Sequence, residues 1–135
     1  MMNFKVGDTA SVSKTITDND IRGFAELVGD YNSLHLDDEY SRKTRFGRRI
    51  AHGMLSASLI STCIGTKLPG SGTVYLSQSF KFVAPVYPDD TVTARVTITN
   101  IREDKPIVTL ETVCVNQRDE LVVKGEAVVL VENIG

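Results

Sequence analysis

An aspartate and two histidines are the residues of this chain whose chemistry is most suggestive. Asp30 precedes His35 by five residues, and His52 is the only other histidine. A histidine changes its charge near neutral pH and an aspartate accepts protons, so a carboxylate and an imidazole that share a cavity can hold a water molecule between them. Such a pair is suited to general acid and base catalysis. The spacing alone also fits a simpler interpretation, in which Asp30 forms a turn, His35 lies at the surface and Asp37 begins a short helix.

Gly53 follows the second histidine, at the predicted start of an apolar helix. The first turn of a helix presents backbone N–H groups without partners, and a glycine there lets a ligand approach the backbone closely. These donors could stabilise negative charge that develops on a carbonyl oxygen, as an oxyanion hole does. Gly53 could equally be the residue that a crowded helix start requires.

Other polar residues near these positions carry less specific signals. The two histidines lie seventeen residues apart without a closely spaced further ligand, which does not match zinc sites, so no metal is expected. The sequence contains no Gly-x-Ser-x-Gly motif, so a serine hydrolase is not expected. On the apolar helix each serine hydroxyl must find a partner or bond back to its own helix; these serines are Ser56, Ser58 and Ser61.

A run of basic residues flanks the candidate site. Such runs are usually solvated surface, but this one could hold the phosphates of a large anionic substrate. The run consists of Arg42, Lys43, Arg45, Arg48 and Arg49.

The pattern of apolar residues predicts the helices that must position these groups. Thr17 or Asp18 is expected to cap a first helix, and Gly29 to end it. The polar segment 30–49 follows, and long loops of this kind are often functional. Residues 52–67 are apolar or small nearly all round, which indicates a helix surrounded by protein.

The period then changes to that of strands. Val, Ile, Thr and Phe dominate, and two segments alternate apolar and polar residues as antiparallel strands do. The predicted strands, with a short edge strand at the start of the chain, cover residues 3–13, 74–83, 91–101, 106–115 and 121–131. An α+β arrangement, with an antiparallel sheet wrapped around the apolar helix, is the simplest packing. Its long apolar edges predict pairing with a second copy, so a homodimer is expected.

Composition limits the classes of function. The chain has 135 residues, of which 41% are hydrophobic and 24% charged, and this is typical of one globular domain over residues 1–135. A net charge of -2 gives no general reason to bind nucleic acid. The absence of a signal peptide and of a long apolar run predicts a cytosolic protein with no membrane partner. Cys63 and Cys114 lack CxxC spacing and are expected to be reduced packing residues.

Two strings of the sequence resemble a known family. DYNSLHLD at 30–37 and RRIAHGML at 48–55 are similar to the hydratase signature of the MaoC-like (R)-specific enoyl-CoA hydratases, which adopt the hot-dog fold. LPG at 68–70 and REDKP at 102–106 resemble the short, single-domain members that supply monomers for polyhydroxyalkanoate synthesis. The resemblance covers nearly the whole chain, so it favours the catalytic interpretation of the dyad.

The resemblance implies a role for each matching residue. Asp30 and His35 would activate the water, and Asn32 would orient substrate or water. The Gly53 amide would bind the thioester oxygen, and Ser61 would line the pocket and help hold Asp30. The implied reaction is the reversible addition of water to a trans-2-enoyl-CoA, which gives the (R)-3-hydroxyacyl-CoA without a metal or redox cofactor.

Alternatives remain open at this level. An acyl-carrier-protein dehydratase runs the same chemistry in reverse, and a hot-dog protein could bind acyl-CoA without turnover. Thioesterases of this fold commonly carry a carboxylate on the central helix, and residues 52–67 contain none. Arg45 and Arg48 are the candidates for contact with the phosphates of either thiol carrier. Arg49 departs from the family pattern, in which proline is common at this position, and that affects the expected rigidity of the loop.

Overall fold

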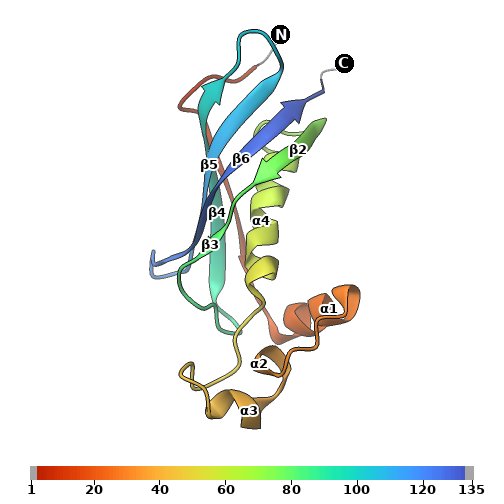
Figure 1. Cartoon of the computed structure of the whole chain (residues 1–135). Helices are drawn as coiled ribbons and strands as arrows, with labels where there is room; N and C mark the ends of the chain where they lie inside the picture. The colour runs from red at the N-terminus through yellow and green to blue at the C-terminus, as the bar shows by residue number, and fades with distance from the viewer. Residues whose placement is uncertain (1–2, 133–135) are drawn as a thin grey trace.

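The computed structural model describes residues 3–132; residues 1–2 and 133–135, the two ends of the predicted domain, lie outside this range. A six-stranded antiparallel sheet packs against one long helix, and three shorter helices form an arm at one end of the molecule (Figure 1). In chain order the elements are β1 (Thr9–Thr15), α1 (Asp18–Val28), α2 (Ser33–Leu36), α3 (Asp38–Arg42), α4 (Gly53–Thr66), β2 (Thr73–Gln78), β3 (Lys81–Phe82), β4 (Thr91–Ile101), β5 (Ile107–Val115) and β6 (Leu121–Val131).

The strands are ordered β1-β4-β5-β6-β2, with β3 also paired to β6. The predicted ranges of the last three strands are confirmed to within one residue. The first strand begins at Thr9 rather than residue 3, because Gly7 takes a positive φ of 97° in the turn before it. The predicted strand 74–83 is divided into β2 and β3, because the chain passes closely over Gly125 at Ser79 and leaves the regular ladder there.

The hydrophobic core lies between α4 and the sheet. Each large side chain in it contributes about 1.5–3 kcal/mol by leaving water. Fully buried members include Ile60, Val96, Val108, Leu110 and Val129. Cys63 and Cys114 are free and buried among them, as predicted.

Helix α4 is buried on one side only, which corrects the expectation of a helix surrounded by protein. Ile60 and Ile64 face the sheet, whereas Ser58 and Thr62 lie on an exposed side. The Ser58 hydroxyl donates to the Leu55 carbonyl at 2.6 Å, and Thr62 bonds back to its own helix in the same way. Small residues with internally bonded hydroxyls therefore gave the sequence its uniformly apolar pattern. No helix in the described part of the chain is long and apolar enough to cross a membrane.

The arm is more ordered than the predicted polar loop. Thr17 caps α1 in a reciprocal pair of bonds with Asp20, and Gly29 ends the helix in the left-handed conformation, both as predicted. Segment 30–49 then contains two short helices, α2 and α3, capped by Asn32 and Asp37. Helices of one turn need a cap but leave no apolar periodicity, which is why the pattern did not reveal α2.

Candidate active site

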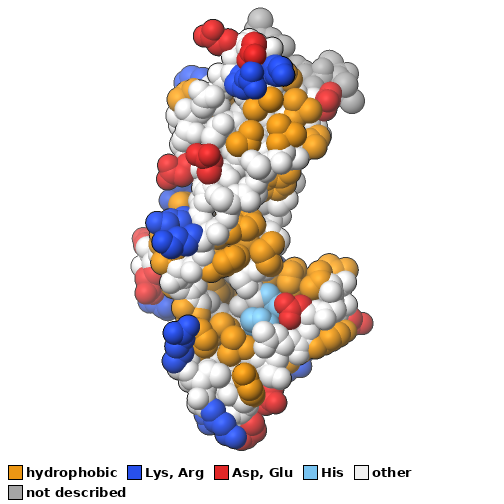
Figure 2. Space-filling view, in the orientation of Figure 1, with side chains coloured by type: hydrophobic (Ala, Val, Ile, Leu, Met, Phe, Trp, Pro, Cys, Tyr) orange, Lys and Arg blue, Asp and Glu red, His pale blue; other side chains and the backbone are white. Residues whose placement is uncertain are grey.

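A cavity of about 450 Å³ opens where the arm meets the first turn of α4. Figure 2 shows histidine atoms in the hollow between the arm and the rest of the molecule, beside an acidic side chain. Most of the lining is apolar, and its polar side chains are those of His35, Arg45 and Ser56. A mainly apolar cavity with a few polar groups is typical of a site for a small organic ligand.

The three residues first singled out lie together beside this cavity, and His35 is the one that lines it. Asp30 directly follows the end of α1, His35 lies in α2, and His52 is the N-cap of α4. One ligand atom from each residue lies within 4.8 Å of the others. One water molecule spans such a distance with two hydrogen bonds of about 2.8 Å. This separation is compatible with a water shared by the carboxylate and an imidazole, which stays a prediction.

His35 is held in one tautomer. Its Nδ1 lies 2.7 Å from the carbonyl oxygen of Ile50, and because a carbonyl only accepts, Nδ1 carries the proton. Burial lowers the pKa of His35, and the nearby His52 acts in the same direction, whereas the bond to Ile50 and the charge of Asp30 oppose them. The neutral ring therefore keeps a lone pair on Nε2, which is the form that a base requires.

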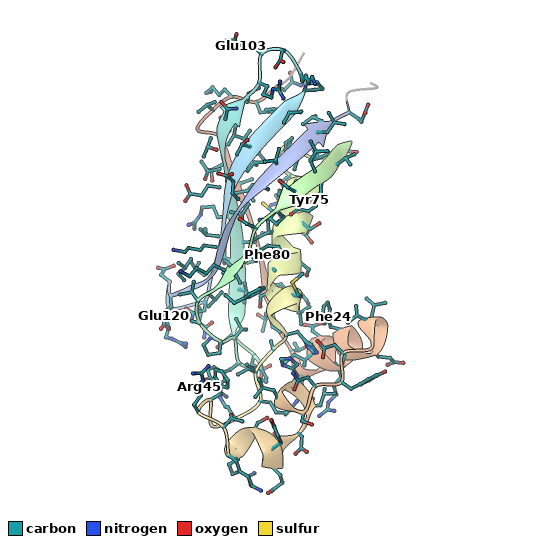
Figure 3. All side chains as sticks on the ribbon, viewed as in Figure 1. Phe24, Arg45, Tyr75, Phe80, Glu103 and Glu120 are labelled. Carbon is teal, nitrogen blue, oxygen red and sulfur yellow. The ribbon has the colours of Figure 1, made fainter. Side chains whose placement is uncertain are left out.

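His52 is also buried, and its Nε2–H donates to the backbone carbonyl of Asp30 at 3.1 Å. Its ring lies between Phe24 of α1, with centroids 5.0 Å apart, and the ring of His35, at 3.9 Å. Figure 3 shows Phe24 at the junction of α1 and the foot of α4. The sequence gave no sign of this role, because neither contact follows from spacing along the chain.

Gly53 supports both interpretations that the sequence left open. Its backbone N–H begins α4, lines the cavity and has no acceptor among the described residues. A Cβ atom at this position, however, would lie 2.7 Å from a ring carbon of Phe82. Gly53 thus offers a free donor to a ligand and also makes room for a neighbouring ring.

Asn32 and Ser61, for which the resemblance implied contact with substrate, water or Asp30, are not among the residues that line the cavity. The Asn32 side-chain oxygen accepts from the Leu34 amide at 3.0 Å, so this residue shapes the start of α2 and does not line the cavity. Ser61 lies on the exposed side of α4, eight residues or about 12 Å beyond Gly53 along the axis. Within one chain it therefore neither lines the cavity nor bonds to Asp30, and the role implied for it stays a prediction.

Ser56 is the serine that does reach the cavity. It lies one turn after Gly53 on the same face of α4, it is 1% exposed, and its hydroxyl has no hydrogen-bond partner among the described residues. A buried hydroxyl without a partner is unfavourable unless a ligand or water satisfies it. The sequence indicated only that the serines of this helix needed partners, and it did not distinguish Ser56 from the others.

The four arginines of the basic run divide into two groups. Arg42 and Arg49 are paired with carboxylates of the arm and α1. Arg45, labelled in Figure 3, lines the cavity, and the Arg48 guanidinium lies 4.0 Å from the centroid of the Tyr87 ring. Neither Arg45 nor Arg48 has a carboxylate within salt-bridge distance in the described chain, so both can meet an anionic ligand.

The grouping of Asp30, His35 and His52 invites comparison with a metal site. Two imidazoles that bind one zinc ion at about 2.1 Å in tetrahedral geometry have their centroids about 5 Å apart. Here the centroids are 3.9 Å apart and the rings are tilted by 31°, which is closer than that geometry gives. One nitrogen of each ring is also bonded to a backbone carbonyl, so the arrangement fits proton transfer better than metal binding.

Known proteins resemble this chain in sequence and in fold. The profile of the MaoC like domain family matches residues 6–121. An (R)-specific enoyl-CoA hydratase of Rhodospirillum rubrum is 48% identical over 129 residues, which cover 96% of this chain and 89% of that protein. A mitochondrial 3-hydroxyacyl-[acyl-carrier-protein] dehydratase of Arabidopsis thaliana is 39% identical over 133 residues, covering 96% and 79%. The solved (R)-hydratase of A. caviae, described as involved in PHA biosynthesis, has a TM-score of 0.94 at 46% identity, covering 98% of this chain and 100% of that one. The predicted hot-dog fold is confirmed, and the chain belongs to the MaoC-like domain family.

Proposed function

We propose that this chain catalyses the reversible, (R)-specific addition of water to trans-2-enoyl-CoA thioesters, giving (R)-3-hydroxyacyl-CoA. The observation that carries the proposal is the position of His35. It is buried and neutral with Nε2 unprotonated, it lies close to Asp30, and it lines the same cavity as Gly53, whose amide has no acceptor among the described residues. The names of the relatives support the same chemistry.

Gly53 supplies the electrophilic half of the mechanism. The thioester carbonyl oxygen accepts a hydrogen bond from the Gly53 N–H, at the positive end of the α4 dipole. This bond draws electron density from the C2–C3 double bond and stabilises the enolate that forms as C3 is attacked. One donor of this kind lowers the activation free energy by about 3–4 kcal/mol.

Asp30 and His35 supply the proton transfers. A water held between the carboxylate and His35 Nε2 gives one proton to the pair as its oxygen bonds to C3. The pair then delivers one proton to C2, so the net change is the addition of one water and the enzyme returns to its starting state. Each general acid or base step of this kind contributes roughly 10²- to 10⁴-fold in rate.

The carrier of the acyl group is expected to lie along the basic rim of the cavity. Arg45, which lines the cavity, and Arg48, which lies against the Tyr87 ring, have no carboxylate partner among the described residues and are the candidates for contact with the phosphates of coenzyme A. The same rim would suit acyl carrier protein, and the Arabidopsis relative supports that alternative. Comparing kcat/KM for matched CoA and carrier-protein thioesters separates the two functions.

A homodimer is the assembly that the surface favours. Strand β2 pairs with β6 along one edge only, and its Val74, Tyr75 and Leu76 are exposed. Helix α4 lies beside this strand in Figure 1, and its Ser61 is exposed. A second copy that covers this edge removes an exposed apolar strand from water. The single domain, paired in this way, is proposed as the working unit, and its free buried thiols suit the reducing cytoplasm.

The first experiment is hydration of crotonyl-CoA, followed by loss of the enoyl-thioester absorbance and by chiral analysis of the product. Asp30→Asn and His35→Gln, confirmed to be folded by circular dichroism, are expected to lose at least 10²-fold in kcat. Arg22→Gln, on the outer side of α1, is the matched control. The proposal fails if the folded wild type binds acyl-CoA but hydrates no chain length, or if the product is the (S) isomer.

A further inference from the structure

The segment 49–52 runs beside the segment that carries the proposed catalytic pair, and four hydrogen bonds join the two. The Ile50 amide donates to the Leu34 carbonyl at 3.3 Å, and His35 Nδ1 donates to the Ile50 carbonyl at 2.7 Å. The other two bonds come from side chains. Arg49 donates to the backbone carbonyl of His35 at 3.2 Å, and His52 donates to the backbone carbonyl of Asp30 at 3.1 Å.

The catalytic segment has little stability of its own. Helix α2 consists of four residues, and single turns are marginal in water without tertiary contacts. Asp30 lies outside any helix, directly after the glycine that ends α1. The bonds from segment 49–52 therefore supply restraint that α1 and α2 do not supply themselves.

Arg49 is built into the arm rather than exposed on it. Its side chain is 14% exposed and lies 2.6 Å from Asp18 of α1 and 2.8 Å from Asp38 of α3. The bond with Asp18 raises the pKa of Arg49, and the Asp38 bond acts in the same direction. A planar guanidinium can serve several acceptors in fixed directions, which a lysine cannot. Arg49 therefore joins α1 and α3 to the carbonyl of His35.

His52 has the corresponding place on the other catalytic residue. It is 2% exposed, and its ring is fixed between Phe24 and His35, so its Nε2–H has a single direction. That direction ends on the carbonyl of Asp30.

We propose that Arg49 and His52 are positioning residues, which hold the backbone carbonyls of His35 and Asp30 and thereby fix the separation of the imidazole and the carboxylate. The inference rests on the proposed hydratase function, because it assigns the two side chains to that reaction. A displacement of about 1 Å at a catalytic group can lower the rate about 10²-fold. Loss of either side chain should therefore lower kcat far more than it changes KM.

Arg49→Gln is the first test, with Arg22→Gln as the matched control. Arg22 also bonds to Asp18, at 2.8 Å, but it makes no bond to α2. We expect kcat of Arg49→Gln to fall 10- to 100-fold with KM within about threefold of the wild type, and Arg22→Gln to stay within twofold. Equal kcat values in these two folded variants would overturn the role of Arg49.

His52→Gln and His52→Asn form the second test. A glutamine places its side-chain amide near the position of Nε2, whereas the amide of an asparagine ends near Nδ1. We expect kcat of His52→Gln to stay within about fivefold of the wild type. We expect kcat of His52→Asn to be at least tenfold lower than that of His52→Gln. A merely structural role predicts equal losses in the two variants, and that result overturns the inference for His52. This pair also decides the matter if Arg49→Gln does not fold.

A readout without turnover separates this inference from the proposed function. The chain contains only two histidines, so nitrogen-15 histidine spectra report each ring by itself. We expect the Nδ1–H tautomer of His35 in the wild type and in Arg22→Gln, and tautomer averaging in Arg49→Gln and His52→Asn. A wild type with these signals but without hydration contradicts the proposed function alone. Unchanged signals and kcat in the two variants contradict the positioning role alone.

Discussion

Replacement of Gly53 by alanine separates the two roles that the structure gives this residue. The new Cβ would lie 2.7 and 2.8 Å from two ring carbons of Phe82, whereas carbon atoms in ordinary contact are about 3.5–4.0 Å apart. The overlap is therefore about 1 Å. Overpacking of this size costs about 1–3 kcal/mol, and the better helix propensity of alanine returns up to about 1 kcal/mol. Because Phe82 is 51% exposed and its ring can move, we expect a net loss of about 1 kcal/mol in the free energy of unfolding.

A double-mutant cycle with Phe82→Leu then tests what the glycine does for catalysis. Phe82→Leu removes the ring that the new methyl group meets, so stability should return in Gly53→Ala/Phe82→Leu. Activity should not return if the thioester must approach the Gly53 amide, because the Cβ remains beside the donor. Loss of one oxyanion donor, at about 3–4 kcal/mol, corresponds to about 10²- to 10³-fold in kcat, and partial obstruction should cost at least tenfold.

The measurements are urea unfolding and crotonyl-CoA hydration for the wild type, both single variants and the double variant. Phe82 lines the cavity, so activity in the double variant is compared with Phe82→Leu and not with the wild type. The oxyanion role of Gly53 is refuted if the double variant has the kcat of Phe82→Leu. In that case the glycine serves only the packing of the ring.

Three further outcomes follow from the site. Burial lowers the pKa of His35 below its ordinary value of 6.5. Because the unfolded chain then takes up a proton at a higher pH than the folded chain, the contribution of His35 to the free energy of unfolding should be complete above pH 6.5 and should fall as the pH drops below it. A His35→Gln variant with the same pH dependence of urea unfolding as the wild type refutes this. Arg45→Ala should raise KM for crotonyl-CoA about three- to tenfold with little change in kcat, because Arg45 lines the cavity. Arg42→Ala is the control and should change neither constant, because Arg42 is paired with a carboxylate of α3. An unchanged KM in Arg45→Ala removes Arg45 from the site. Ser56→Ala should raise the free energy of unfolding by about 1 kcal/mol at fixed protein concentration, because it removes a buried hydroxyl that has no partner among the described residues. A lower free energy of unfolding would show that the hydroxyl is hydrogen-bonded in solution.

The last three strands and the first helix were predictable because their signals are local. The alternation in 91–101 and 107–115, with polar turns between, defines β4 and β5, and Thr17 and Gly29 mark the ends of α1. The choice between Ser56 and Ser61 was not local. Both lie on one helix, and only the tertiary position of the arm decides which of them faces the cavity.

Arg49 illustrates the same limit on the electrostatic side. In the sequence it is the last of a basic run, which suggests solvated surface or phosphate contact. Its partner Asp18 lies 31 residues away in the chain, and spacing of that kind carries no signal. Arg49 ties α1 to α3 through its two ion pairs, and this restrains the loop that carries it.

Segment 49–53 links the two halves of the proposed mechanism. The Ile50 carbonyl fixes the tautomer of His35, and three residues later the Gly53 amide offers its hydrogen bond to the thioester. Arg49 and His52 hold opposite ends of the same segment against the catalytic pair, so loss of either should already release both Asp30 and His35. The double variant Arg49→Gln/His52→Asn should therefore lose less in kcat than the product of the two single losses. If the losses multiply, each side chain holds its own catalytic residue independently, and the segment does not act as one unit.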